Sequence, residues 1–159
     1  MQEAVQDRRG AGHVRVEQIG LAKSSDGIHW KRSPKPVMKI GASDSIDSIQ
    51  ATGMHVLKKG DEYWMWYGAY NGNHTIGLAT STDGVHWAKA NGGQPVQGLE
   101  GPAQLGPSVY FDGRQFFMLY NHGSQGGWDM FAATSADGTS LASDLQSFPL
   151  VAGATRAAG

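Results

Sequence analysis

Two stretches of the sequence combine aromatic, amide and imidazole side chains in a mixture that suits sugar recognition. Each follows a short apolar run, at residues 63–67 and 116–120. Carbohydrates stack their apolar CH faces on aromatic rings, and their hydroxyls need polar partners. The competing interpretation is a pair of ordinary hairpin loops, in which Asn and Gly are expected anyway. The substrate-binding candidates in these stretches are Tyr70, Asn71, His74, Asn121, His122 and Trp128.

An internal repeat identifies the elements that must position these side chains. Residues 19–30 and residues 76–87 are identical at nine of 12 positions. The shared pattern is Ile-Gly-Leu-Ala-x-Ser-x-Asp-Gly-x-His-Trp. A weaker third copy at residues 133–138 follows at nearly the same spacing and lacks the His-Trp pair.

The aspartates of this repeat have a structural interpretation. Each stands in an Asp-Gly turn between two β-type runs, where aspartate side chains bond to backbone amides. We therefore expect Asp26, Asp83 and Asp137 to cap turns and to take no part in catalysis. Trp30 and Trp87 of the repeat are expected in the core, with His29 and His86 packed or hydrogen-bonded beside them.

Each unit is predicted to contain four short antiparallel strands. The runs at residues 63–67 and 116–120 are apolar on both faces, which is typical of a strand covered on both sides. Repeated four-stranded sheets of this length are the blades of a β-propeller. The predicted fold class is therefore all-β, with a half blade at about 14–45, a full blade at about 46–100 and a third at about 101–155. A degenerate fourth strand is expected near residues 145–151, and no convincing amphipathic helix is expected.

About two and a half blades are fewer than the 4–8 of typical propellers. An open arc would expose apolar sheet faces and unpaired edges. Either the chain is a piece of a larger protein, or copies assemble. Because two copies of two and a half blades make five, we expect a homodimer that closes a five-bladed ring.

Composition excludes several classes of function. Thirteen Lys and Arg against 14 Asp and Glu leave a net charge of −1, so neither nucleic acid nor a membrane surface is an expected partner. The six histidines show no metal-ligand spacing, and zero cysteines remove thiolate zinc sites. No signal-peptide pattern begins the chain and no apolar run reaches membrane length, so the expected location is the cytoplasm, with secretion as the alternative if the chain is truncated.

With these motifs placed, the chain resembles the five-bladed propeller superfamily of glycoside hydrolases, which includes arabinanases, β-xylosidases, invertases and levansucrases. The resemblance covers roughly residues 14–138. It implies carboxyl groups at the innermost strands of separate blades, flanking the glycosidic bond. On this basis Glu100 is the expected proton donor, Asp47 the base or nucleophile, and Asp44 its substitute or tuning partner. The competing interpretation makes all three solvated loop carboxylates.

The resemblance also bears on His55, which falls within the innermost strand of the full blade. It is a substrate-binding candidate that faces the channel, against the alternative of a structural histidine. We expect no cofactor, and a channel metal such as calcium is implied by the resemblance alone. The expected function is a carbohydrate-active module that binds glycan, with glycoside hydrolysis to be tested. The alternative is a non-catalytic protein that keeps the blades for binding or assembly.

Overall fold

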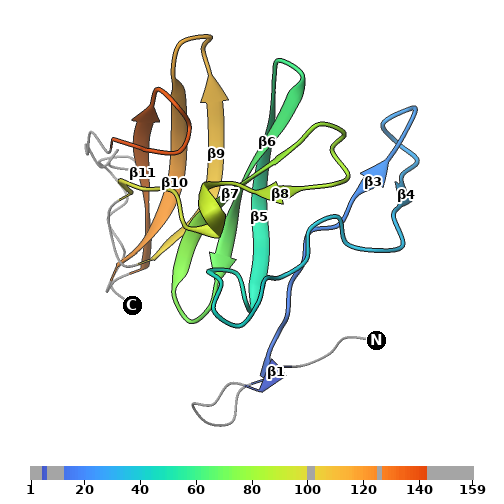
Figure 1. The fold of residues 1–159 in the computed structure, drawn as a ribbon, viewed down its shortest axis with the longest axis horizontal. Coiled ribbons are helices and arrows are strands. Elements are labelled where there is room, and N and C mark those ends of the chain that lie inside the picture. The colour runs from blue at the N-terminus through green and yellow to red at the C-terminus, as the bar shows by residue number, and fades with distance from the viewer. Residues whose placement is uncertain (1–4, 7–12, 100–102, 125–126, 143–159) are drawn as a thin grey trace, which may run out of the picture.

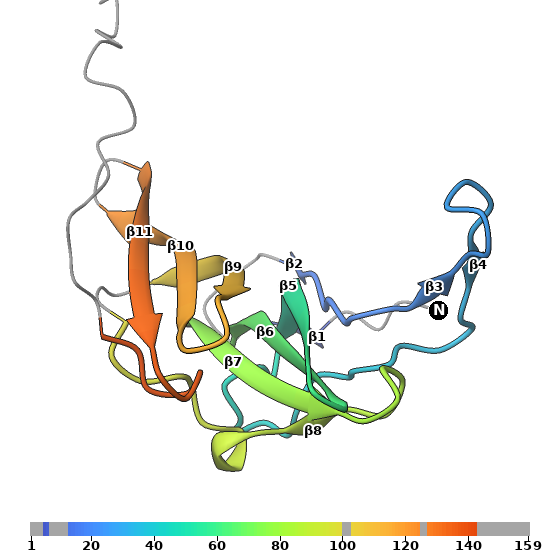
Figure 2. The ribbon, with the colours of Figure 1, turned by 90° about the horizontal axis from the view of Figure 1, so that it is seen from above.

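The computed structural model describes residues 5–6, 13–99, 103–124 and 127–142, and these residues form an all-β structure. The sheets follow one another around an open arc (Figures 1 and 2). A 3₁₀ turn, η1 (Asn91–Gly93), interrupts the strands. The strands are β1 (Val5–Gln6), β2 (His13–Val14), β3 (Ala22–Lys23), β4 (Lys31–Arg32), β5 (Gln50–Lys59), β6 (Glu62–Tyr70), β7 (His74–Ser81), β8 (Ala88–Lys89), β9 (Gln104–Phe111), β10 (Phe116–Ser124) and β11 (Gly127–Ser135).

Strands β5–β8 form one four-stranded antiparallel sheet in chain order, which we call blade two. Its β6 strand has the predicted two-residue period. Met65 and Tyr67 face the β3–β4 side of the sheet, whereas Trp64 and Trp66 face the β9–β11 side. Tyr67 and Trp66 have no exposed surface, and Met65 is 1 % exposed. The expected burial of this strand on both faces is confirmed.

Strands β9–β11 form the sheet that we call blade three. Its first strand lies beside the first strand of blade two (Figure 1). Trp66, Ile76 and Leu78 of blade two pack in one cluster with Phe116 and Met118 of blade three. Trp66 also donates a hydrogen bond through Nε1 to the carbonyl of Gly138, at 3.0 Å. Apolar packing and a buried hydrogen bond thus fix the two blades together.

The two-stranded sheet β3–β4, which we call blade one, repeats the outer half of blade two. Ala22 pairs with Arg32 in blade one, and their counterparts in the repeat, Ala79 and Lys89, pair in blade two. Ile19 and Met38 connect this half blade to blade two through the second core cluster, which includes Met65 and Tyr67. Blade one therefore supplies third and fourth strands, as the repeat predicted.

At its outer edge, blade three has the same strand pairing as blade two. Thr80 pairs with Ala88 in blade two, and an isolated antiparallel bridge joins Thr134 to Ala142 at the equivalent place in blade three. The start of a fourth strand thus stands at Ala142, ahead of the predicted residues 145–151, which lie outside the described residues. Within the described residues no helix is long and apolar enough to cross a membrane.

Candidate functional site

The aspartates of the repeat cap tight turns, as predicted. Ser81 Oγ accepts hydrogen bonds from the N–H groups of Asp83, at 3.2 Å, and Gly84, at 2.9 Å. Asp83 Oδ1 accepts from the N–H groups of Val85 and His86, both at 2.8 Å. Its other oxygen lies 2.7 Å from His86 Nδ1. The pKa of Asp83 is held well below its usual range by these hydrogen bonds. The bond from the His86 side chain has the largest effect, followed by the bonds from the backbone N–H groups of His86 and Val85.

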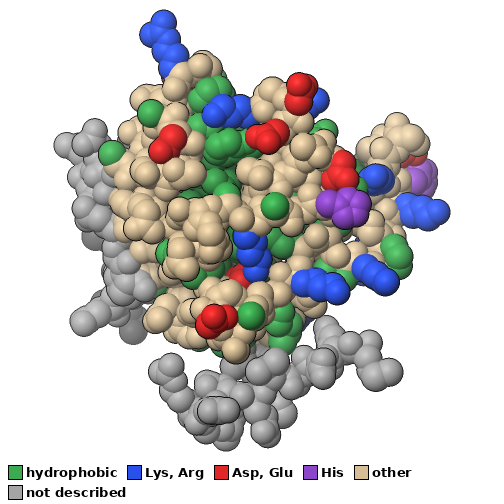
Figure 3. Space-filling view, in the orientation of Figure 1, with side chains coloured by type: hydrophobic (Ala, Val, Ile, Leu, Met, Phe, Trp, Pro, Cys, Tyr) green, Lys and Arg blue, Asp and Glu red, His purple; other side chains and the backbone are tan. Residues whose placement is uncertain are grey.

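The other two turns follow the same plan. Asp26 accepts from the Ile28 and His29 amides and contacts His29 Nδ1 at 2.7 Å. The side chain of His29 is the largest cause of the lowered pKa of Asp26. In the third copy, which has no histidine, the pKa of Asp137 is lowered mainly by the amides of Ser140 and Thr139. Histidines lie beside acidic side chains at the β3–β4 and β7–β8 turns (Figure 3).

The two repeat tryptophans differ. Each donates its indole N–H to the turn carbonyl three residues earlier, at 3.0 Å for Trp30 and 3.2 Å for Trp87. Trp87 packs against the second core cluster, but Trp30 is 62 % exposed. The prediction of a core position is therefore wrong for Trp30. The reason is that blade one covers Trp87, whereas the described residues contain no blade that could cover Trp30.

Asp47 is fully buried in the loop before β5. Lys89 Nζ of β8 lies 2.6 Å from Asp47 Oδ2 and 2.7 Å from Oδ1. The hydroxyls of Ser45, at 3.1 Å, and Tyr67, at 3.3 Å, donate to the same carboxylate. Burial and the charge of Asp47 raise the pKa of Tyr67. Since Asp47 has no exposed surface and several donors, the geometry supports a structural role for it, and its expected role as base or nucleophile stays a prediction.

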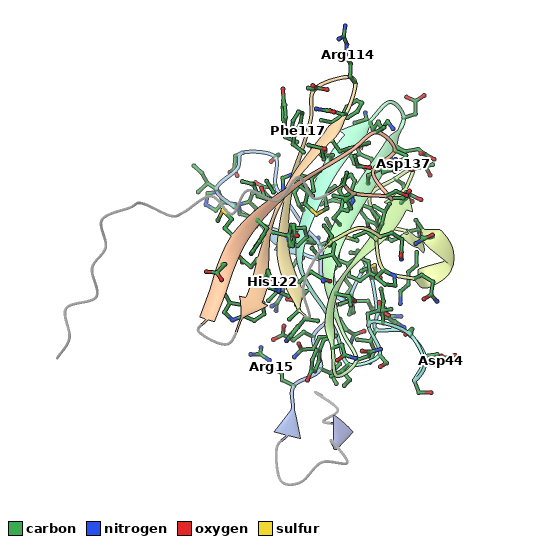
Figure 4. All side chains as sticks on the ribbon, turned by 90° about the vertical axis from the view of Figure 1, so that its left-hand side faces the viewer. Arg15, Asp44, Arg114, Phe117, His122 and Asp137 are labelled. Carbon is green, nitrogen blue, oxygen red and sulfur yellow. The ribbon has the colours of Figure 1, made fainter. Side chains whose placement is uncertain are left out.

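Of the other two carboxylate candidates, the structure describes only Asp44. Asp44 is exposed on the loop before β5 and projects away from the sheets, on the other side of the molecule from His122 (Figure 4). Glu100 lies outside the described residues. Its role as proton donor therefore stays a prediction from the resemblance.

The polar-aromatic stretches do meet, at the end of the blades where β6 turns into β7 and β10 into β11. The rings of Tyr70 and His74 lie 4.5 Å apart, and those of His74 and Trp128 lie 5.9 Å apart, edge to face. Trp128 is 52 % exposed, and its ring lies over Gly123, where an added Cβ would stand 3.5 Å from it. This contact joins blade two to blade three through residues that the sequence singled out.

His122 lies on β10 near the same end of blade three, where its ring packs edge to face on Phe131 at 5.1 Å. We call Tyr70, His74, His122 and Trp128 the rim cluster. By strand alternation His74 shares the face of Trp66, turned to blade three, while His122 shares the face of Met118, turned to blade two. Within the described residues, His74 Nδ1 and His122 Nε2 are buried and have no hydrogen-bond partner. Burial lowers the pKa of His74, so its imidazole is neutral at pH 7.

The remaining binding candidates lie apart from the rim cluster or have other contacts. Asn71 donates to the Ser45 carbonyl at 3.4 Å and accepts from the Asn73 amide at 3.2 Å, so it links two loops. His55 stands opposite Trp66, midway along β5. Asn121 stands beside Gly106, where an added Cβ would lie 3.0 Å from the Asn121 amide nitrogen.

Sequence reasoning missed Lys89 and Tyr67, the partners of Asp47. The sequence contained one sign that Lys89 has a role, because Arg32 and Lys89 are basic residues at the same position of the repeat. No three His, Asp or Glu side chains gather as metal ligands within the described ranges. A channel metal therefore stays an expectation from the resemblance.

No family model matches the sequence. Curated relatives do match, and among them are two from Mycobacterium tuberculosis. The uncharacterized protein MT1551 is 32% identical over 131 residues, which are 76% of this chain and 42% of the relative. The uncharacterized protein Rv1502 is 29% identical over 107 residues, which are 65% of this chain and 35% of the relative. The chain thus spans less than half the length of the curated relatives that it matches.

Solved structures similar to this chain define the class of its fold. A β-1,2-mannobiose phosphorylase from Listeria innocua is 18% identical, with a TM-score of 0.65 over 84% of this chain and 37% of its own. A putative glycoside hydrolase from Parabacteroides distasonis is 21% identical, with a TM-score of 0.64 over 90% and 45%. A GH32 β-fructofuranosidase from Bombyx mori is 16% identical, with a TM-score of 0.58 over 79% and 29%. The chain has the fold of part of a propeller-type glycoside hydrolase.

Proposed function

We propose that the rim cluster binds carbohydrate. The observation that supports this most directly is the half-exposed ring of Trp128 against His74, whose buried Nδ1 has no partner within the described residues. A buried polar atom without a hydrogen bond is costly, and a sugar hydroxyl would remove that cost once a shift of the ring brought Nδ1 to the surface. The indole would stack on the CH face of the same sugar.

The similar structures add a second line of support. One is described as a complex with β-1,2-mannobiose and another as a β-fructofuranosidase, so glycosides are the ligand class that they share. Because so few residues are identical, this likeness establishes only the fold, and the ligand class is carried over as part of the proposal. The choice of sugar and linkage therefore belongs to the experiment, as do the activity and partners of any longer protein that contains this chain.

The positions of the described carboxylates favour a protein that binds a glycan without hydrolysing it. A glycosidase needs two carboxyl groups that both reach the glycosidic bond. Asp47 is enclosed and paired with Lys89, and exposed Asp44 points away from the sheets. Hydrolysis would depend on Glu100, which lies outside the described residues.

A glycan array followed by calorimetry on the strongest ligands tests the proposal. Trp128→Ala and His74→Ala should each weaken binding about tenfold or more, the equivalent of about 1.4 kcal/mol. Trp30→Ala is the matched control, because it removes another exposed indole from a turn in blade one. If no glycan binds, or if Trp30→Ala weakens binding as much as Trp128→Ala, the rim cluster is not a carbohydrate site. Unchanged melting curves would show that lost binding does not reflect unfolding.

A further inference from the structure

The junction between blades two and three is closed by backbone hydrogen bonds at the outer edge of the sheets. The backbone of Gln97, which follows the last strand of blade two, donates to the carbonyl of Thr139 at 3.0 Å. It also accepts from the N–H of Leu141 at 2.9 Å. Leu141 is buried in the cluster that the two blades share. The repeat turn of blade three is thus bonded directly to blade two.

The matching junction between blades one and two lacks these bonds. Met38 of blade one stands where Gln97 stands in blade two, because the valine before each donates to the isoleucine that opens its repeat. Met38 bonds instead to Ile19 of its own blade, donating at 3.3 Å and accepting at 3.1 Å. Among the described residues no hydrogen bond joins residues 33–37 to residues 85–87. This junction therefore stays open.

The open junction is a groove of about 470 Å³ between the loop that follows β4 and the β7–β8 turn. The loop contributes Pro34, Lys35 and Pro36, and the turn contributes His86 and Trp87. Trp87 is half-buried against the second core cluster, and its indole N–H is already bonded within the turn. The indole therefore offers the groove an apolar surface.

Both walls of the groove belong to the described chain, and further blades of a longer protein would not fill it. Blade two ends at its outermost strand, β8, and β4 is the counterpart of β8 in blade one. A longer chain would add strands to blade one at the free edge of β3, and β3 contributes none of the described residues that line the groove. A blade placed before blade one would cover its other face, turned away from blade two.

The loop side of the groove is basic. Residues 31–39 contain four Lys and Arg and no Asp or Glu, although the net charge of the whole chain is −1. None of these four cations forms an ion pair within the described part of the chain. Lys and Arg side chains gather over blade one, on the right of Figure 3. Asp83, the acid of the opposite turn, is already bonded to His86 and to backbone amides. The groove therefore complements a negatively charged ligand.

We propose that this groove binds an acidic glycan, with a sugar carboxylate on Lys35 and a sugar ring on Trp87. A lysine and a carboxylate form a charge-assisted hydrogen bond, and an indole stacks on the CH face of a sugar. His86 adds a polar contact. Since the Asp83 carboxylate lies 2.7 Å from Nδ1, that nitrogen is the donor to Asp83 and Nε2 is left for the ligand. The groove lies at the opposite end of β7 from His74, so this site is separate from the rim cluster.

Calorimetry at low ionic strength tests the role of charge, with an oligogalacturonate and the same oligomer methyl-esterified at its carboxylates. The wild type should bind the acid form about tenfold or more tighter than the ester. Lys35→Ala should remove most of this difference. Lys58→Ala is the matched control, because it takes an exposed lysine from β5 and changes the net charge equally. No binding of the acid form, equal binding of acid and ester, or equal effects of the two variants would overturn the proposal.

Trp87→Leu tests the aromatic wall. The third copy of the repeat carries Leu141 at this position, so leucine suits the turn. This variant should weaken binding of the oligogalacturonate about tenfold or more. Trp30→Leu is the matched control, because Trp30 holds the same repeat position but lines no part of the groove, and it should bind as the wild type does. Equal binding by Trp87→Leu and the wild type, with both folded by their melting curves, would refute the stacking contact and the proposal with it.

Two further measurements separate this site from other occupants and from the rim cluster. A glutamate peptide with the same number of carboxylates should bind more weakly than the oligogalacturonate, and equal binding would assign the groove to acidic peptides instead. Trp128→Ala should leave binding of the oligogalacturonate unchanged. If Trp128→Ala abolished that binding and Lys35→Ala did not, the acidic glycan would occupy the rim cluster, and the groove would not be a glycan site.

Discussion

Lys89 and Asp47 form an ion pair that spans blade two, with Nζ 2.6 Å from a carboxylate oxygen that has no access to solvent. Lys89 belongs to the last strand of the blade, and Asp47 to the loop that enters its first strand. Gly41 lies against this pair, where an added Cβ would stand 2.8 Å from Lys89 Nζ. The ion pair therefore ties the loop that carries two catalytic candidates to the outer edge of the sheet.

Lys89→Met should destabilise the protein by about 3–5 kcal/mol, because it leaves the Asp47 charge buried and unpaired. The double variant Asp47→Asn with Lys89→Met should recover much of this loss, since no charge remains in the site. Urea unfolding measures both. A Lys89→Met variant as stable as the wild type would mean that Asp47 reaches water and is available for chemistry.

Trp66→Ala and Met65→Ala should each cost about 2–5 kcal/mol, because they open cavities on opposite faces of β6. Trp66 contacts blade three and Met65 contacts blade one, so the pair tests both blade interfaces. Thermal unfolding is the measurement. An unchanged melting temperature for either variant would show that its side of blade two is open to solvent.

Acid should destabilise the turns of the repeat. The pKa of Asp83 in the folded chain lies below its ordinary value of 3.8. A lowered carboxyl pKa contributes stability that is present above the unfolded value and is lost as the pH falls towards the folded one. Stability should therefore decline below about pH 4, and Asp83→Asn should make that decline shallower. Asp44→Asn, which removes a charge from an exposed loop, is the control, and an equal effect of both variants would contradict the prediction.

If the chain or its assembly hydrolyses a glycoside, Glu100→Gln should impair it on a natural substrate far more than on an activated aryl glycoside. The reason is that a poor leaving group depends on protonation by the acid, whereas a good one does not. Steady-state rates on both substrates provide the comparison. Equal rate losses on the two substrates would remove Glu100 from the role of proton donor.

The repeat made most of the fold predictable from the sequence. Its Asp-Gly turns indicated where strands end, and the two-residue period of residues 63–67 indicated which side chains face each neighbour. Trp30 shows where this reasoning stops, because a repeat position is buried only if an adjacent blade covers it. Gly77 and Gly20 occupy the same position of the repeat, and they too differ in how closely other residues pack against them. An added Cβ at Gly77 would stand 2.5 Å from the Tyr67 ring, but at Gly20 it would meet nothing.

The candidate site was predictable in part. The meeting of His74 with Trp128 follows from equivalent loops on adjacent blades, which the repeat placed side by side. The burial of Asp47 did not follow, because its partner Lys89 is far along the chain and pairs through space across a whole sheet. The repeat marks a basic residue at this position, as Arg32 and Lys89, but it does not indicate which acidic residue pairs with it.

The third and fourth strands pair in the same register in blades one and two, so residues 22–78 form one repeating unit, which we call a cassette. The pairing of Ala22 with Arg32 recurs as that of Ala79 with Lys89, so a cut before Ala22 and a cut before Ala79 fall at the same point of the blade. A second cassette spliced at this point would enter and leave the sheet in phase. Duplication of this segment would therefore lengthen the arc by one whole blade, and its deletion would shorten the arc by one.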